Sequence, residues 1–309
     1  MTAIYDVVRA GGVDLPDEPE GKVRWAAGAK DGVLLMHTAM TTPVDEAEAV
    51  LVAITAYVDD PTTWDSLYGL LCETRALPVL DHVSRRIPET ELNRGSVREL
   101  ALRLTTTSSD REPVKYGLAL LGLAGDRSDV EIVRALAGHD EFTLPGLVAL
   151  ARQIEDVEPQ WWELARRLRG WGRIHLVHRL ARSARPEIRR WILVDGYRNE
   201  IMDEYLALIA AEAGGLADAL ADDPDDELLD SACRLIGTLL AGSGPAGDIH
   251  DYADGVRAVT NLLAQLEKRP SNPVRLTVVH ELRDFLSEGH EAWPAELAAT
   301  CGRIVDAAA

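Results

Sequence analysis

The sequence predicts an all-α protein of stacked antiparallel helix pairs, and three observations predict it. Apolar residues recur at helical spacing through most of the 309 residues, with turn residues interrupting them roughly every dozen positions. Only 2 residues are Phe, so the 47% hydrophobic content comes largely from small and aliphatic side chains that suit closely packed helices. Second helices of successive pairs begin near residues 143, 173 and 199, and this spacing is typical of helical repeats.

Residues 1–44 show the least regular pattern, and we expect an irregular N-terminal cap there. Within it, Asp31 is predicted to cap a helix that runs to Met40. From residue 45 the helical signal is steady, and each helix is bounded by Asp, Pro, Thr or Gly. The predicted helices span residues 45–58, 64–75, 77–87, 96–107, 112–124, 129–138, 143–155, 160–169, 173–183, 186–194, 199–213, 216–221, 225–241, 251–268, 273–287 and 293–307.

The clearest break is the glycine-rich run from Gly242 to Gly247. It divides a helical-repeat body over residues 45–242 from C-terminal helices over residues 248–309, which we expect to continue the same stack. The turn from Gly125 to Asp129, with the helices that follow it, resembles one repeat of the HEAT-like α-solenoids. This resemblance covers residues 45–305 and implies an α-solenoid fold.

Charge is distributed unevenly along the chain. The stretch from Trp161 to Arg190 contains nine arginines and two glutamates, a net charge of +7. The whole chain carries −19, so the rest of the chain carries −26. The overall negative charge disfavours nucleic-acid and membrane partners, because contacts to phosphate supply most nonspecific affinity for nucleic acids. We call residues 162–198 the basic band and expect it to bind another protein or a peptide.

A helical wheel divides the stretch from Arg173 to Arg182 into two faces. Aliphatic residues gather on one face, and His175, His178, Arg179 and Arg182 on the other, which we expect to point outward. The predicted binding residues are Trp162, Arg166, Trp171, Arg173, His175, His178, Arg179, Arg182, Trp191 and Arg198. The competing interpretation is that these arginines pair with acidic residues of neighbouring helices.

Cysteine use and hydropathy indicate a cytoplasmic protein. Cys72, Cys233 and Cys301 are odd in number and far apart, which predicts neither a disulfide framework nor a zinc site. The N-terminus lacks the pattern of a signal peptide, and apolar runs stay shorter than the ~18 residues of a membrane span.

No catalytic or metal motif is complete. His280-Glu281 begins like a zincin motif, but aspartate replaces the second histidine. His175 and His178 have metal-ligand spacing, yet arginines on the same face would repel a cation. We therefore predict no cofactor and no metal, and Asp195 is the candidate acid or base if the protein is an enzyme.

Two narrower resemblances concern the basic band. The run from Gly170 to His175, with Arg198-Asn199 downstream, is similar to uncharacterised bacterial proteins sometimes labelled limonene hydroxylase, although no dinucleotide or haem-thiolate motif supports that label. Trp161-Trp162 resembles the paired tryptophans of solenoid DNA glycosylases, but Arg166 stands where those enzymes have a carboxylate.

Three functions therefore remain open. The first is a protein- or peptide-binding α-solenoid scaffold that uses the basic band. The second is an acidic inhibitor or immunity-type protein that binds a cationic partner. The third is a solenoid enzyme acting on a phosphate-bearing substrate such as alkylated DNA, with Asp195 as its acid or base.

Overall fold

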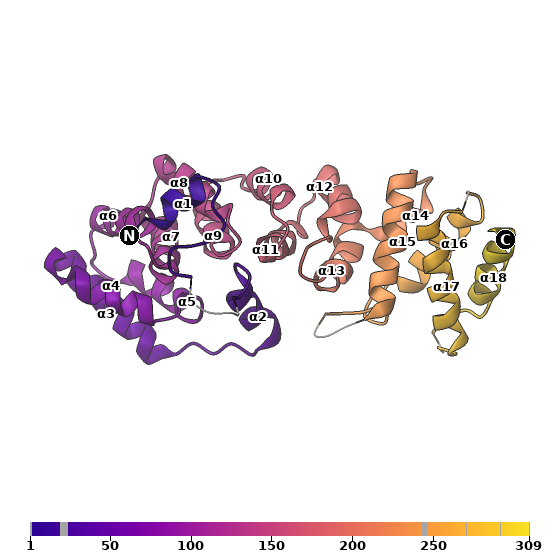
Figure 1. Ribbon diagram of the computed structural model, residues 1–309, viewed down its shortest axis with the longest axis horizontal. Coiled ribbons are helices and arrows are strands. Elements are labelled where there is room, and N and C mark those ends of the chain that lie inside the picture. Colours follow the sequence, from indigo (N-terminus) through magenta and orange to yellow (C-terminus); the bar gives the residue numbers. More distant parts are fainter. Residues whose placement is uncertain (1, 19–23, 243–245, 270, 291, 309) are drawn as a thin grey trace. The chain divides into compact units, whose positions relative to one another are not determined.

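The computed structural model describes residues 2–18, 24–242, 246–269, 271–290 and 292–308, and all regular structure in these ranges is helical (Figure 1). The prediction of an all-α protein is confirmed. The α-helices are α1 (Ile4–Arg9), α2 (Ala29–His37), α3 (Val44–Asp59), α4 (Trp64–Glu73), α5 (Ala76–Arg86), α6 (Arg94–Thr107), α7 (Arg111–Ala124), α8 (Val130–Ala137), α9 (Thr143–Gln153), α10 (Glu158–Arg167), α11 (Trp171–Leu180), α12 (Pro186–Trp191), α13 (Glu204–Gly214), α14 (Leu216–Ala221), α15 (Asp226–Ala241), α16 (Gly255–Leu266), α17 (Pro273–Ser287) and α18 (Glu296–Ala308).

The chain forms two compact units, Met1–Leu176 and Val177–Ala309, and the division falls inside α11. We call them the N-terminal and C-terminal units. Part of the predicted break at Gly242 to Gly247, residues 243–245, lies outside the described residues. No described helix is long and apolar enough to cross a bilayer.

Helices of the N-terminal unit pack on their neighbours and on the helix two places along the chain. α6 packs on α7 and α8 on α9, while α3 contacts α5, α5 contacts α7 and α7 contacts α9. Gly117 explains the closeness of α6 and α7, because a Cβ there would lie 2.8 Å from the Cβ of Leu104. The core between these helices is aliphatic, with Leu100, Leu104 and Leu118 fully buried.

The C-terminal unit repeats this pattern. α13, α15 and α17 contact one another in succession, as do α14, α16 and α18. Local signals begin two of these helices: the Asp225 carboxylate accepts a hydrogen bond from the Leu228 N–H (2.9 Å), and Asn272 accepts one from the Arg275 N–H (2.9 Å). Residues close in sequence therefore begin these helices, and Pro186 likewise stands at the first position of α12.

A π-helix, Ile192–Gly196, follows α12, where the sequence predicted that an ordinary helix would continue to residue 194. π-Helical turns are rare because they loosen the backbone hydrogen bonding of the helix. Here the Ser231 hydroxyl donates to the Leu193 carbonyl (2.8 Å) and lies 3.1 Å from that of Val194. A side chain of α15 thus satisfies carbonyls of the π-helix.

Within the N-terminal segment, the predicted cap of α2 is wrong. α2 begins after Gly28, whose φ of +73° is a conformation that favours glycine, and it ends at His37 rather than Met40. Asp31 lies within α2 and is buried. Gly32 packs on Trp171, because a Cβ at Gly32 would overlap the indole ring.

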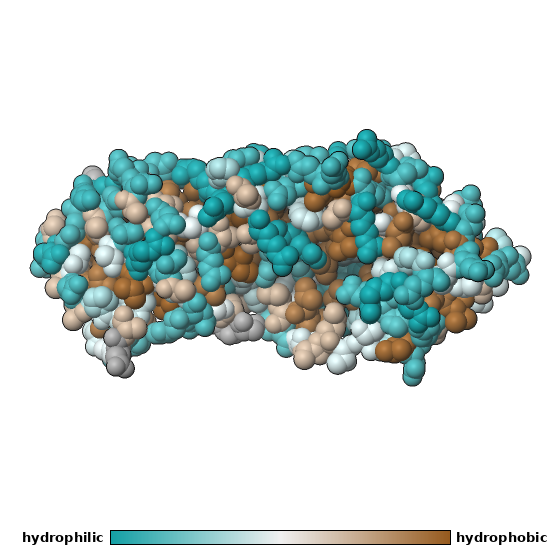
Figure 2. All heavy atoms as spheres, turned by 180° about the vertical axis from the view of Figure 1, so that it is seen from behind, coloured by the Kyte–Doolittle hydropathy of each residue, from teal (hydrophilic) through white to brown (hydrophobic). Residues whose placement is uncertain are grey.

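Apolar areas lie among a majority of hydrophilic side chains on the face drawn in Figure 2. Several large apolar residues are exposed in and beside α2, among them Trp25 (54%), Leu35 (40%) and Met40 (39%). Exposed aromatic and aliphatic side chains gathered in one segment are typical of surfaces that contact other proteins.

Candidate functional site

In the N-terminal unit, three predicted binding residues of the basic band are buried. Trp171, Arg173 and His175 are 3%, 0% and 4% exposed, so the expectation that His175 points outward is wrong. Arg173 donates from Nε to the Ala165 carbonyl of α10 (3.1 Å), and the rings of Trp171 and His175 have centroids 6.3 Å apart. These side chains hold the first part of α11 in place inside the unit.

The Gly-Trp-Gly motif also has a structural explanation. The Gly172 N–H donates to Asp140 Oδ1 (2.6 Å), so this carboxylate caps the start of α11. A Cβ at Gly170 or Gly172 would lie 2.9 or 2.8 Å from a carboxylate oxygen of Asp140. The glycines therefore leave room for the cap.

Two other residues of the band in this unit reach the surface. Arg166 is exposed, and its guanidinium lies 5.5 Å from the ring centroid of the half-buried Trp162. In the C-terminal unit, Arg179, Arg182 and Arg198 are exposed.

The remaining predicted residues of the C-terminal unit are half-buried: His178, Trp191 and Asp195, the last within the π-helix. Burial first, and then the charge of Arg179, lowers the pKa of His178, so its imidazole is neutral at pH 7. A binding role for the basic band stays a prediction.

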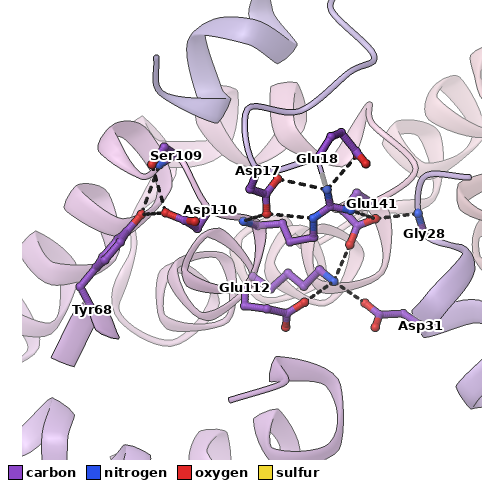
Figure 3. A network of polar contacts seen from close by, with 11 residues as sticks. Asp17, Glu18, Gly28, Asp31, Tyr68, Ser109, Asp110, Glu112 and Glu141 are labelled. Atoms are coloured by element: carbon purple, nitrogen blue, oxygen red, sulfur yellow. Dashed lines mark hydrogen bonds and ion pairs between the residues drawn. The ribbon is translucent and has the colours of Figure 1, made fainter. Parts of the chain in front are cut away.

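The densest polar site lies elsewhere, around Arg111 and Lys115 at the start of α7 (Figure 3). These residues are four apart, so both side chains project from one face of the helix. Five carboxylates surround them, from the N-terminal segment (Asp17, Glu18, Asp31), from α7 (Glu112) and from the loop before α9 (Glu141).

Lys115 is 2% exposed and uses all three of its N–H donors on carboxylates. Its Nζ lies 2.7 Å from Asp31, 2.7 Å from Glu141 and 3.1 Å from Glu112. Burial alone would lower the pKa of Lys115, but the three carboxylates raise it above its ordinary value. Lys115 is therefore a fixed cation, and it cannot act as a neutral amine nucleophile or base at physiological pH.

Arg111 fastens the N-terminal segment to α7. Its Nε and Nη2 lie 2.9 and 3.1 Å from the two oxygens of Asp17, a bidentate arrangement, and Nη2 also lies 2.8 Å from Glu18. Nη1 lies 3.5 Å from Glu141.

Glu141 joins the two cations to α2. It accepts a hydrogen bond from the Gly28 N–H (2.8 Å), and so it sits at the positive end of that helix. Burial alone would raise the pKa of Glu141, but Lys115, the Gly28 N–H and Arg111 together hold it below its ordinary value. The carboxylate is therefore ionised at neutral pH.

A pocket of about 300 Å³ opens beside this network. Its floor includes the buried network residues, whereas Lys30, Glu73 and Arg75 are exposed at its rim. We call it the charged pocket; its lining residues are Asp17, Lys30, Cys72, Glu73, Arg75, Arg111, Glu112, Lys115 and Glu141.

The surroundings of the Cys72 thiol in the charged pocket make it slow to react. Burial and then the carboxylates of Asp110, Asp17, Glu73 and Glu112 raise the pKa of Cys72 to about 11. Because the thiolate is the nucleophilic form, a thiol that stays protonated at pH 7 does not serve as a nucleophile. The charged pocket thus favours binding over covalent catalysis.

Among the described residues, no group of three His, Cys, Asp or Glu is arranged to hold a metal ion.

Two carboxylates of the charged pocket, Glu112 and Glu73, keep unused acceptor capacity. Glu112 accepts one donor at each oxygen, from Lys115 and from the Ala76 N–H (2.7 Å), which leaves further acceptor capacity on both oxygens. Glu73 forms no ion pair with any described residue. A ligand that brings N–H donors and positive charge fits such a site.

Sequence reasoning missed this site, although one signal was available. Lys115 lies in the middle of a strongly apolar predicted helix, and a lysine on a buried face requires acidic partners. The partners themselves carry no local signal, because Asp31 and Asp17 lie 84 and 94 residues from Lys115 and Arg111.

Comparisons with protein-family models, curated proteins and solved structures find no match to this chain.

Proposed function

We propose that this protein is a HEAT-like helical-repeat scaffold that binds another protein or a peptide, and that its charged pocket receives a lysine or arginine side chain of that partner. The unused acceptor capacity of Glu112 and Glu73 in a pocket of about 300 Å³ carries the proposal. This volume is enough for one long cationic side chain.

Two features of the N-terminal unit support a macromolecular partner. The contacts between helices two places apart are those expected when helix pairs stack as a solenoid, and such stacks present extended binding surfaces. Trp25 and Leu35 are exposed on the same segment that supplies Asp31 and Lys30 to the site. Tryptophan is among the residues enriched at the hot spots of protein interfaces.

The test uses hexa-arginine and hexa-glutamate peptides as probes. We expect hexa-arginine to bind and to slow alkylation of Cys72, the cysteine that lines the pocket, while Cys233 and Cys301 are buried. Glu73→Gln combined with Glu112→Gln should weaken binding about a hundredfold or more, since two lost charge-assisted hydrogen bonds of roughly 1.5–3 kcal/mol each amount to about 3 kcal/mol at the least.

Glu99→Gln is the matched control, because Glu99 is an exposed carboxylate of the same unit and does not line the pocket. Equal loss of affinity in this control and in the pocket variant would show that general acidity, not the pocket, attracts the peptide. Absence of Cys72 protection by bound hexa-arginine would place the peptide elsewhere.

The basic band supplies a second candidate, a surface for an acidic segment of a partner. Arg179 and Arg182 are exposed and form no ion pair with a described carboxylate, which supports this use. We expect hexa-glutamate to lose affinity in the Arg179→Glu, Arg182→Glu double variant and to keep it in Arg167→Glu. Arg173 is unsuitable for charge reversal because it is fully buried.

A further inference from the structure

Two cationic side chains, Lys30 and Arg75, lie at the rim of the charged pocket. Lys30 follows the first residue of α2, and Arg75 directly precedes α5. Both line the pocket, both are exposed, and neither forms an ion pair with a described residue. The pocket therefore combines the unused acceptor capacity of Glu112 and Glu73 with two cations at its rim that pair with no described carboxylate.

A ligand complementary to this arrangement must carry both signs of charge within a short distance. A cationic side chain of the ligand would pair with Glu112 and Glu73 but would give Lys30 and Arg75 no anionic partner. A carboxylate close to that cation would complete the pairing, because guanidinium and ammonium groups both bind carboxylates by charge-assisted hydrogen bonds. The cavity of about 300 Å³ limits the ligand to roughly one residue.

We infer that the charged pocket recognises the C-terminal residue of a partner chain, a lysine or arginine whose free α-carboxylate binds Lys30 and Arg75. A basic residue at a chain end is the part of a polypeptide that places a carboxylate and a long cationic side chain on the same Cα. Within a chain, the same residue has a neutral amide in place of that carboxylate. This inference rests on the proposed function, and it adds that the partner is recognised by its end.

The experiment compares four ligands on the full chain. Three are labelled ten-residue peptides: one that ends in arginine as the free acid, the same peptide as the amide, and the free acid with norleucine in place of arginine. The fourth ligand is free arginine. Binding is followed by fluorescence anisotropy, or by calorimetry for free arginine, and pocket occupancy by protection of Cys72 from iodoacetamide. We expect the arginine acid to bind about tenfold more tightly than the amide and than the norleucine acid.

Rim variants then assign the carboxylate contact. Lys30→Gln with Arg75→Gln should remove the preference for the acid over the amide without changing the affinity of the amide. Arg152→Gln is the matched control, an exposed arginine of the same unit that forms no ion pair with a described residue. Both rim residues are exposed, so these substitutions should leave the fold intact.

The outcomes separate the two proposals. Equal binding of acid and amide, both weakened by Glu73→Gln, would refute recognition of a chain end and leave the cationic pocket standing. No binding of any peptide, including hexa-arginine, would refute both. Free arginine binding as tightly as the peptide acid would show a site for the amino acid itself, and would refute a partner chain as its ligand.

Discussion

Replacing Lys115 by methionine tests whether the buried network is as tightly coupled as its distances indicate. Methionine keeps the length of the side chain but removes the charge, and it leaves Asp31, Glu112 and Glu141 without their shared cation. Removing one partner of a buried ion pair costs about 3–5 kcal/mol, because the remaining charge stays buried without compensation. In a unit of this size we expect the melting temperature to fall by roughly 10 °C.

The pH dependence gives a sharper version of this test. In the wild type the pKa of Glu141 is lowered, so its contribution to stability is complete above its ordinary pKa and is lost as the pH falls through the lowered value. In Lys115→Met, burial is no longer offset by the lysine, and the pKa of the same carboxyl should rise. Acidification protonates the buried carboxyl and so removes its uncompensated charge from the variant. The difference in free energy of unfolding between the wild type and Lys115→Met should therefore become smaller from pH 7 to pH 4.

Urea unfolding at several pH values, followed by circular dichroism, measures this gap. Arg167→Met is the control, because Arg167 and Glu163 are both more than half exposed and lie 3.9 Å apart; such pairs contribute about 0–1 kcal/mol. A Lys115→Met gap below 1 kcal/mol, or one that does not change with pH, would refute the reasoning.

Close packing, the π-helix and the pocket thiol each lead to a further prediction. Gly32→Ala should cost about 1–3 kcal/mol in thermal unfolding because its methyl overlaps Trp171, whereas Gly69→Ala, which meets no atom within 4 Å, should be neutral or stabilising by up to about 1 kcal/mol; equal effects would contradict the packing. Ser231→Ala should lower the stability of the C-terminal unit by about 1 kcal/mol, and an unchanged urea midpoint would argue against a role for its hydroxyl in the π-helix. Cys72 should react with iodoacetamide at pH 8 about a hundredfold more slowly than an ordinary thiol, as mass spectrometry can measure; a normal rate would disprove the effect of burial and the nearby carboxylates.

The helices could be predicted where the signals that begin them are local. α17 spans 273–287 as predicted, since Asn272 and Pro273 start it, and α15 lies within one residue of its predicted range. These signals depend on residues close in sequence, and they hold whatever the helix later packs against.

The candidate site could not be predicted in the same way, because it depends on which helix faces are covered. The wheel over α11 assumed one buried face, yet α2 packs on Trp171 from the N-terminal segment, and Arg173 reaches back to α10. The outward prediction held for Arg179 near the end of α11 and for Arg182 in the turn after it, and failed for His175. A cluster of arginines in the sequence therefore does not define a surface until it is known which elements pack against each turn of the helix.

The number of carboxylates in the network around Arg111 and Lys115 argues for a binding role rather than a purely structural one. Fastening the N-terminal segment to α7 requires two carboxylates for the two cations, and five are present. Each extra buried carboxylate has a desolvation cost, and apolar side chains of similar volume would often stabilise the fold more. A cation that enters the pocket relieves this excess, so bound arginine peptides should raise the melting temperature of the wild type, and more weakly that of the Glu73→Gln, Glu112→Gln variant.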